Sequence, residues 1–272
     1  MIDFPGSKIN LGLRVTQRLE NGYHTIESIF IPSDFSDVLE IIKLDEKESS
    51  RFYFKGLSIP GDPKDNLIYK AYKLLSRDFE IPPFEAHLLK IIPTGTGLGG
   101  GSADASSMLM LLNRLFDLQI STRDLEIYAK MLGADCPFFI KKQCAYVEGI
   151  GDKISPFELD LSSYHLLILC PDLHISTKEA FQNIIPTHPG QHLKDIILNY
   201  PIEKWKDYVF NDFEDYAFHI LPILEDIKAG FYEMGALYAS MSGSGSAIYG
   251  IFSSQIDLAP SLSEYVHFWQ KL

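Results

Sequence analysis

Cysteine, long apolar runs and positive charge are all scarce in this sequence of 272 residues. The three cysteines, Cys136, Cys144 and Cys170, show no CxxC spacing. They therefore indicate reduced thiols, packed as small apolar core residues, in a cytoplasmic protein. Because no run of about 18 apolar residues occurs, no membrane-spanning helix is expected. The first residues also lack the basic and apolar regions of a signal peptide.

The shortage of positive charge limits the kinds of partner. The sequence has 24 Lys and Arg against 36 Asp and Glu, a formal net charge of −12. Non-specific binding to nucleic acid is therefore not expected, because its affinity comes mainly from Lys and Arg on phosphates. An anionic small molecule would need a local positive site to overcome the overall field.

Strands dominate the first ninety residues, with one helix inserted, and this order favours an α+β fold over a regular βαβ array. Length predicts one large or two closely associated domains, and composition shifts weakly near residues 154–162, which places the domains at 1–155 and 156–272. Strands are expected at 9–15, 35–44, 51–55, 84–92, 143–148, 166–170, 237–241 and 247–252. Helices are expected at 66–75 (capped by Asp65), 103–116, 123–132 (capped by Ser121 or Thr122 and stopped by Gly133), 178–184, 193–200 and 213–234 (broken at Pro222).

The most informative stretch is the glycine-rich segment Pro93–Ser102, directly before the predicted helix from Ala103. Glycines let backbone amides approach phosphate oxygens, and a helix amino terminus favours an anion. A strand, a glycine loop and a helix together predict a phosphate cradle. The alternative is a flexible turn without a ligand.

Better-known nucleotide motifs do not fit this segment. Gly95, Gly97 and Gly100 satisfy GxGxxG, but a second helix follows where a dinucleotide-binding fold needs a strand ending in an acidic residue. The Walker A motif is excluded because no lysine follows Gly101. Protein kinases are excluded because the sequence has neither an HRD nor a DFG segment.

Six short segments, in order along nearly the whole chain, resemble motifs of the GHMP kinases and of their cytidine-diphosphate-methylerythritol kinase branch. Two departures from the usual spelling, the pair Gly6-Ser7 and the residue Cys136 in place of Val, remove no functional side chain. Residues 186–205 cannot be aligned with substrate-binding residues. The six segments are Gly6-Ser-Lys-Ile-Asn-Leu11, Asn21-Gly-Tyr-His24, Pro93-Thr-Gly-Thr-Gly-Leu-Gly-Gly-Gly-Ser-Ala-Asp-Ala105, Leu132-Gly-Ala-Asp-Cys-Pro-Phe-Phe139, Asn211-Asp-Phe-Glu214 and Ser242-Gly-Ser-Gly-Ser246.

The resemblance implies an α+β, two-domain GHMP kinase fold with the active site in the cleft between the domains. It also implies that ATP, with Mg²⁺, phosphorylates the 2-hydroxyl of 4-(cytidine 5′-diphospho)-2-C-methyl-D-erythritol, in the non-mevalonate pathway to isoprenoids. The partner is then a small molecule, neither nucleic acid nor membrane, and the protein is a monomer or weak homodimer. The rival interpretations are a GHMP kinase for another alcohol, such as mevalonate or homoserine, and a non-catalytic nucleotide-binding module.

The resemblance also assigns site residues. Asp135 would be the general base. Lys8 would lie beside it, keep the Asp135 carboxylate ionised and stabilise the developing alkoxide. The ATP-binding candidates are Asn66, Pro93, Gly95, Gly97, Leu98, Gly99, Gly100, Gly101 and Ser102. The substrate-binding candidates are Asn10, Tyr23, His24, Phe181, Ser242, Gly243 and Gly245.

Several of these residues have a simpler explanation that the sequence leaves open. Asp135 and Asn66 could each cap a helix, and Ser102 could cap the helix from Ala103 while it contacts phosphate or Mg²⁺. Lys8 could be a surface charge, and Phe181 a core residue. Asp104, in the first helical turn, is expected as a surface acid favoured by the helix dipole. The histidines show no metal-ligand spacing.

Overall fold

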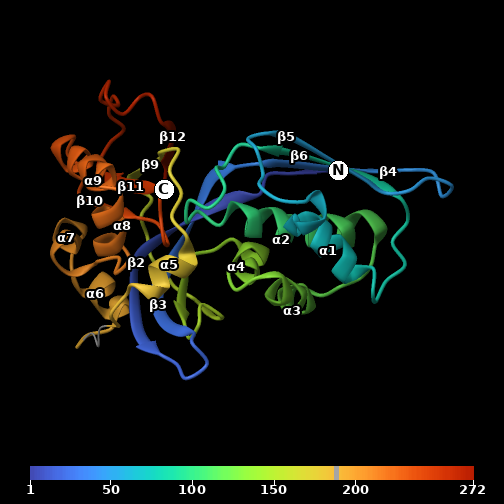
Figure 1. Cartoon of the computed structure of the whole chain (residues 1–272), viewed down its shortest axis with the longest axis horizontal. Helices are drawn as coiled ribbons and strands as arrows, with labels where there is room; N and C mark the ends of the chain where they lie inside the picture. Colours follow the sequence, from blue (N-terminus) through green and yellow to red (C-terminus); the bar gives the residue numbers. More distant parts are fainter. Residues whose placement is uncertain (187–189) are drawn as a thin grey trace. The chain divides into compact units, whose positions relative to one another are not determined.

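The computed structural model describes residues 1–186 and 190–272, which form two compact units built from interleaved segments (Figure 1). Unit 1 comprises Met1–Ser7, Asp34–Thr94 and Gly99–Gln143. Unit 2 comprises Lys8–Ser33, Gly95–Leu98 and Cys144–Leu272. The expected domains 1–155 and 156–272 were contiguous, so they differ in kind from these compact units, and that boundary stays a prediction.

Unit 1 is a four-stranded sheet with helices packed on it. Strand β6 (Phe84–Lys90) pairs antiparallel with β4 (Val38–Lys43) and parallel with β5 (Arg51–Gly56), and β1 (Ile2–Asp3) pairs with the other edge of β4. The helices are α1 (Leu67–Leu75), α2 (Gly100–Phe116), α3 (Thr122–Leu132) and α4 (Cys136–Lys141), and a 3₁₀ turn covers Pro63–Asp65.

Every second residue of β6 is buried, and this alternation explains how the helices pack on the sheet. Phe84, Ala86 and Leu88 alternate inward along β6, and the apolar sides of α1 and α2 cover them in one continuous core. In Figure 1 the four helices of unit 1 lie along the same side of β4, β5 and β6. The sheet and its core therefore hold the start of α2, where the glycine segment ends.

Three local predictions for unit 1 are corrected. Helix α2 begins at Gly100 rather than Ala103, with Gly99 as its N-cap in the left-handed conformation. Helix α1 is capped by Asn66 rather than Asp65, because the Asn66 side chain accepts the Ile68 amide hydrogen bond at 3.0 Å. The expected strand at 35–44 is two strands, since β3 ends at Ser36 and β4 begins at Val38. The Ser121 cap and the Gly133 stop of α3 are confirmed.

Unit 2 holds two further four-stranded sheets. The first residues of β2 and the last residues of β3 belong to segments of unit 1. The first sheet has the order β2 (Gly6–Arg18), β3 (His24–Ser36), β7 (Ala145–Glu148), β8 (Lys153–Pro156). The second has the order β10 (Tyr238–Met241), β11 (Ile248–Phe252), β9 (His165–Cys170), β12 (Val266–Lys271), with antiparallel neighbours. The helices are α5 (Thr177–Gln182), α6 (Leu193–Asn199), α7 (Trp205–Tyr208), α8 (Glu214–Ile220) and α9 (Ile223–Glu233), and a 3₁₀ turn covers Ile202–Lys204.

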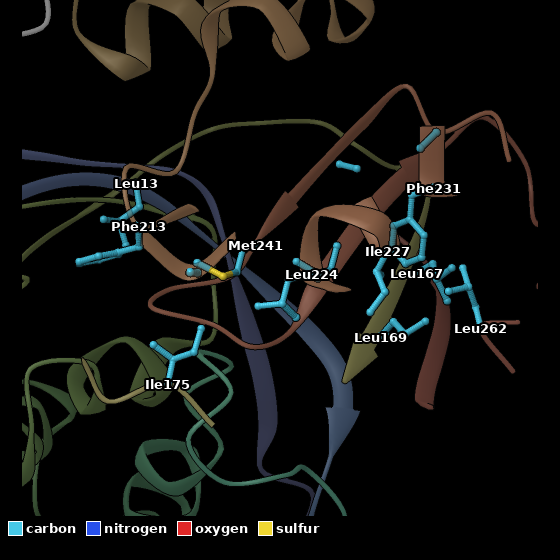
Figure 2. Close-up of a cluster of buried hydrophobic side chains, with 14 of the residues drawn as sticks. Leu13, Leu167, Leu169, Ile175, Phe213, Leu224, Ile227, Phe231, Met241 and Leu262 are labelled. Atoms are coloured by element: carbon cyan, nitrogen blue, oxygen red, sulfur yellow. The ribbon is translucent and has the colours of Figure 1, made fainter. Parts of the chain in front are cut away.

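The core of unit 2 packs helix α9 against the second sheet. Leu224, Ile227 and Phe231 of α9 belong to one buried cluster with Leu167 and Leu169 of β9, as Figure 2 shows. The predicted helix break at Pro222 is confirmed, since α8 ends at Ile220 and α9 begins at Ile223. The early part of β3, together with β8 and β12, was not predicted.

Two broader predictions concern the cysteines, expected as reduced thiols in the core, and membrane-spanning helices, of which none was expected. All three cysteines, which lie in the described part of the chain, are free thiols, with Cys136 and Cys170 buried and Cys144 partly buried. Across residues 1–186 and 190–272, each helix is too short or too polar to cross a membrane.

Candidate functional site

The tip of the glycine segment, Gly95–Leu98, is built into unit 2 by backbone contacts. Lys8 N donates to Leu98 O at 2.9 Å, and Ala247 N donates to Thr96 O at 3.1 Å. Gly97 has a φ of 79°, and a β-carbon there would overlap the carbonyl oxygen of Ser242. Glycine at this position is therefore required by the close approach of two loops as well as by its backbone angle.

Lys8 lies buried at this tip, at 3% exposure, so the surface-charge explanation is wrong. Its ammonium donates to Gly97 O at 2.8 Å and to Asn10 Oδ1, and it lies 4.7 Å from the ring centre of Phe30. A buried ammonium held against neutral oxygens and an aromatic face brings a positive charge to the glycine tip.

Asn10 and Ser242 connect β2 to the segment Ser242–Ser246, which resembles the third GHMP kinase motif and is called the third motif below. The Asn10 amide donates to Ser242 Oγ at 3.3 Å, and Ser242 Oγ donates to Gly97 O at 3.0 Å. The Asn10 side chain also donates to Ser28 Oγ at 2.9 Å. Asn10 and Ser242, predicted as substrate-binding residues, are therefore placed beside Lys8 and the glycine tip, where they fix both.

The third motif, Ser242–Ser246, packs closely on the glycine tip. A β-carbon at Gly243 would lie 3.0 Å from the Gly97 α-carbon, and one at Gly245 would lie 2.6 Å from the Met241 sulfur. Both glycines have positive φ, 56° and 87°. Their first role is thus to let this loop pack, and substrate contact by them stays a prediction.

The segment Asn211–Glu214, noted in the sequence only for its resemblance, anchors this third loop. Asn211 Nδ2 donates to Met241 O at 2.7 Å and to Gly243 O at 2.8 Å. Glu214 Oε1 accepts from Met241 N at 2.8 Å, while Lys228 donates to its other oxygen at 2.6 Å. These buried polar side chains hold the loop in place through hydrogen bonds, a positioning role that sequence reasoning missed.

The predicted base-binding residues have different environments in unit 2. Tyr23 is 62% exposed, whereas His24 is buried at 8%. The His24 ring stacks on Phe181 with centroids 5.3 Å apart, and Phe181 meets Phe213 edge-on at 4.8 Å. Burial, and then the nearby Arg18 charge, lower the pKa of His24. Phe181 therefore packs on the core, as its alternative explanation stated, and also meets His24.

Unit 1 presents the start of α2 to a ligand. The first-turn amides of a helix have no carbonyl partner in that helix, so they attract anions. A β-carbon at Gly101, which is exposed, would have the Leu67 side chain at 3.7 Å as its nearest neighbour, so the surface beside this turn is open. Ser102 lies inside the first turn and is not the cap that was one of its predicted roles. Phosphate binding at this helix start stays a prediction.

Beside α1, unit 1 has a pocket of about 240 Å³. The Asn66 side chain caps α1, so its simpler explanation is confirmed, and Asn66 also lines this pocket. A backbone hydrogen bond joins the pocket wall to β6, since Leu57 N donates to Lys90 O at 2.9 Å. The other lining residues are Phe54, Lys55, Gly56, Ser58, Ile59, Pro60, Gly61, Asp62 and Pro63.

Asp135 stands at the N-cap position of α4, before Cys136 and Pro137. Within the described residues its side chain makes no capping hydrogen bond to that helix, so the capping explanation is not supported. The carboxylate is partly buried. Its role as general base stays a prediction.

The expectation for Asp104 is wrong. It is 3% exposed, and Lys90 Nζ donates to its Oδ2 at 2.9 Å and to Asp37. Burial raises the pKa of Asp104 to about 7, although the Lys90 ammonium lowers it and Asp37 adds to the rise. Lys90 and Asp37 were missed, and the hint in the sequence was a polar Lys90 at the end of an otherwise alternating strand.

Comparisons with known proteins identify the family of this chain. Family profiles described as "GHMP kinases N terminal domain" and "GHMP kinases C terminal" match residues 66–143 and 201–264. The 4-diphosphocytidyl-2-C-methyl-D-erythritol kinase of Bacteroides thetaiotaomicron is 49% identical over 258 residues, covering 94% of this chain and 93% of the relative. The chain belongs to the GHMP kinase family.

Several solved structures are similar to the structure of this GHMP kinase. The crystal structure of a 4-(cytidine 5′-diphospho)-2C-methyl-D-erythritol kinase has a TM-score of 0.76 at 30% identity, covering 92% of this chain and 89% of that one. Homoserine kinase from Cytophaga hutchinsonii has a TM-score of 0.64 at 18% identity, covering 92% and 85%, and shows the shared fold alone. The predicted α+β GHMP kinase fold is confirmed, and GHMP kinases use ATP.

Proposed function

We propose that this GHMP kinase transfers the γ-phosphoryl group of ATP to the 2-hydroxyl of 4-(cytidine 5′-diphospho)-2-C-methyl-D-erythritol, giving the 2-phosphate and ADP. The reaction belongs to the non-mevalonate pathway to isopentenyl diphosphate. The observation that carries the proposal is the buried Lys8 ammonium, bonded to Gly97 O at the tip of the glycine segment. The 49% identity to a kinase named for this alcohol supports the choice of substrate.

ATP would be held mainly by the backbone. The pocket lined by Asn66 would take the adenine, and the first turn of α2, with Gly101 and Ser102, would take phosphate oxygens. Among the described residues no cluster of three His, Cys, Asp or Glu side chains could hold a metal by itself. Mg²⁺ would be bound chiefly through nucleotide phosphates and water, as is usual for this ion, and would neutralise phosphate charge. Pro93, Gly95, Gly99 and Gly100 would shape the segment.

Phosphoryl transfer depends on positioning and charge more than on covalent chemistry by the protein. Asp135 would accept the proton of the attacking hydroxyl, because it stands at the position of the general base in the resembling kinases and its side chain is partly buried. Lys8 would stabilise the negative charge that develops on the oxygens during transfer. A non-catalytic nucleotide-binding protein would need neither role.

Tyr23, His24 and Phe181 would recognise the cytosine. His24 and Phe181 already lie at direct stacking distance, 5.3 Å, so a base between them would have to displace the His24 ring. The His24 imidazole could then hydrogen-bond the base edge, with the exposed Tyr23 ring closing over its face. Phe181 would keep its contact with Phe213 throughout.

A substrate panel tests the proposal. ADP release from ATP is measured with the cytidyl alcohol, methylerythritol phosphate, mevalonate and homoserine. The proposal expects the cytidyl alcohol to be phosphorylated with the highest kcat/KM, and CDP to compete with that alcohol but not with ATP. Efficient turnover of mevalonate or homoserine, without competition by CDP, would contradict the substrate assignment and leave the kinase assignment standing.

Two secondary points stay proposals. The free thiols fit a cytoplasmic location, where disulfides are rare. A monomer or weak homodimer remains the expected assembly, which sedimentation velocity at several concentrations would decide.

A further inference from the structure

A buried ion cluster in unit 1 lies under the start of the phosphate-binding helix. It consists of Lys90 at the end of β6, Asp37 between β3 and β4, and Asp104 in the first turn and a half of α2. These residues are 2%, 0% and 3% exposed. Burial lowers the pKa of Lys90, but the two carboxylates outweigh it and raise that pKa. Such a cluster costs desolvation, so packing alone does not account for it.

The cluster joins the two flanks of the glycine segment. Before the segment, Asp37 Oδ1 accepts from Ile91 N at 2.5 Å and from Ile92 N at 2.8 Å. After it, Asp104 Oδ2 accepts from Lys90 Nζ at 2.9 Å. The Lys90 ammonium donates to both carboxylates, so one charge connects the residues on either side of 93–99.

The Lys90 ammonium also lies close to Gly100, the first residue of α2. A β-carbon at Gly100 would be 3.0 Å from Lys90 Nζ and 3.0 Å from the Ile92 side chain. We propose that Lys90, Asp37 and Asp104 are positioning residues that hold the first turn of α2 in the orientation needed to bind ATP phosphates. The proposal rests on the proposed function, in which this turn binds ATP.

Variants of Asp104 test the proposal, because Asp104 lies after the segment and faces Lys90 and Asp37. Asp104→Ala removes the link to α2, and Asp104→Asn keeps an oxygen that can accept from Lys90. ATP affinity is measured by calorimetry, and KM for ATP and for the alcohol by steady-state kinetics. Leu125→Ala, a buried residue of the same core on α3, is the control for a general loss of stability.

We expect Asp104→Ala to weaken ATP binding about tenfold and to leave KM for the alcohol within twofold of wild type. Asp104→Asn should restore most of the affinity. Leu125→Ala should lower Tm without changing ATP affinity. If Asp104→Ala binds ATP as wild type does, or if Leu125→Ala weakens ATP binding equally at the same loss of Tm, the positioning role is wrong.

Failure of the proposed function would look different. If the wild type binds ATP but does not phosphorylate the cytidyl alcohol, the substrate assignment fails and the Asp104 result still decides the positioning role. If the wild type binds no ATP, both proposals fall.

Discussion

The two parts of the glycine segment use glycine for different reasons. At the tip, Gly97 is required by the fold, because a β-carbon would overlap Ser242 and the φ of 79° disfavours other residues. At the helix start, a β-carbon at Gly101 would make only an ordinary van der Waals contact, 3.7 Å from the Leu67 side chain. A glycine that packing does not require, at a helix end that attracts anions, is best explained by a ligand that must approach the backbone.

The same contrast separates residues that serve folding from residues that serve the reaction. Residues of the first kind should change stability when substituted, and those of the second should change binding or rate at constant stability. Each substitution below is predicted to change stability, binding or rate, or both, beginning with the largest expected effect.

Gly97→Ala should cost the most stability. A positive φ costs a non-glycine residue roughly 1–2 kcal/mol and overpacking another 1–3, so roughly 3 kcal/mol is expected in total. Gly235→Ala is the matched control, because its φ is 93° but its β-carbon would have open space. Urea unfolding should show the smaller, backbone cost alone for Gly235→Ala. Equal losses for the two variants would mean that the Ser242 contact does not constrain Gly97.

Asp135→Asn should act on the rate and not on the fold. Losing a general base slows turnover by about a hundredfold or more. Because asparagine has nearly the same size and shape as aspartate and position 135 is only partly buried, the free energy of unfolding should stay close to that of wild type. Steady-state kinetics and calorimetric ATP binding separate the two effects. Near-normal kcat in a folded variant would remove Asp135 from the mechanism.

Tyr23→Ala should raise KM for the cytidyl substrate and leave ATP affinity unchanged. Stacking on a base is worth about 1–3 kcal/mol, so an increase of roughly tenfold is expected. Tyr23 is 62% exposed, so stability should not change. Phe181→Ala, by contrast, should raise KM and also lower Tm, because Phe181 packs on both His24 and Phe213. An unchanged KM in both variants would contradict the cytosine site.

Gly101→Ala should have the smallest effect, in opposite directions on fold and binding. Alanine in a helix is favoured over glycine by about 0.5–1 kcal/mol, so stability should rise slightly while a methyl group crowds the phosphates and weakens ATP binding severalfold. Gly230→Ala in α9 is the control, since its β-carbon would likewise make only an ordinary van der Waals contact, 3.8 Å from Leu262. It should gain similar stability without affecting ATP. Unchanged ATP affinity in Gly101→Ala would argue against phosphate binding at this turn.

Local patterns in the sequence predicted much of this fold. The strand that begins at Phe84, a cap at either Ser121 or Thr122 and the break at Pro222 were predicted from short-range signals, and the structure confirms the strand, the cap at Ser121 and the break. Strand β12 was missed because its stability comes from pairing with β9, almost a hundred residues earlier in the chain. The start of α2 was misplaced because glycine has low helix propensity, which sheet packing overrides here.

The candidate site was predicted less completely, and the reason is physical. Lys8 was identified through resemblance, whereas its burial depends on Phe30, Asn10 and Gly97, which no local pattern brings together. The pairing of Lys90 with Asp104 likewise joins a strand end to a helix, and a lone acid in a first helical turn is usually exposed. Buried polar networks are tertiary features.

The position of the transferred phosphate tests the central claim most directly. The wild-type protein is incubated with ATP, Mg²⁺ and 4-(cytidine 5′-diphospho)-2-C-methyl-D-erythritol, and the products are examined by ³¹P NMR. The proposed reaction predicts one new phosphate monoester on the 2-hydroxyl, an intact cytidine diphosphate group and one equivalent of ADP. Recovery of the alcohol unchanged, or a phosphate on any other oxygen, would contradict it.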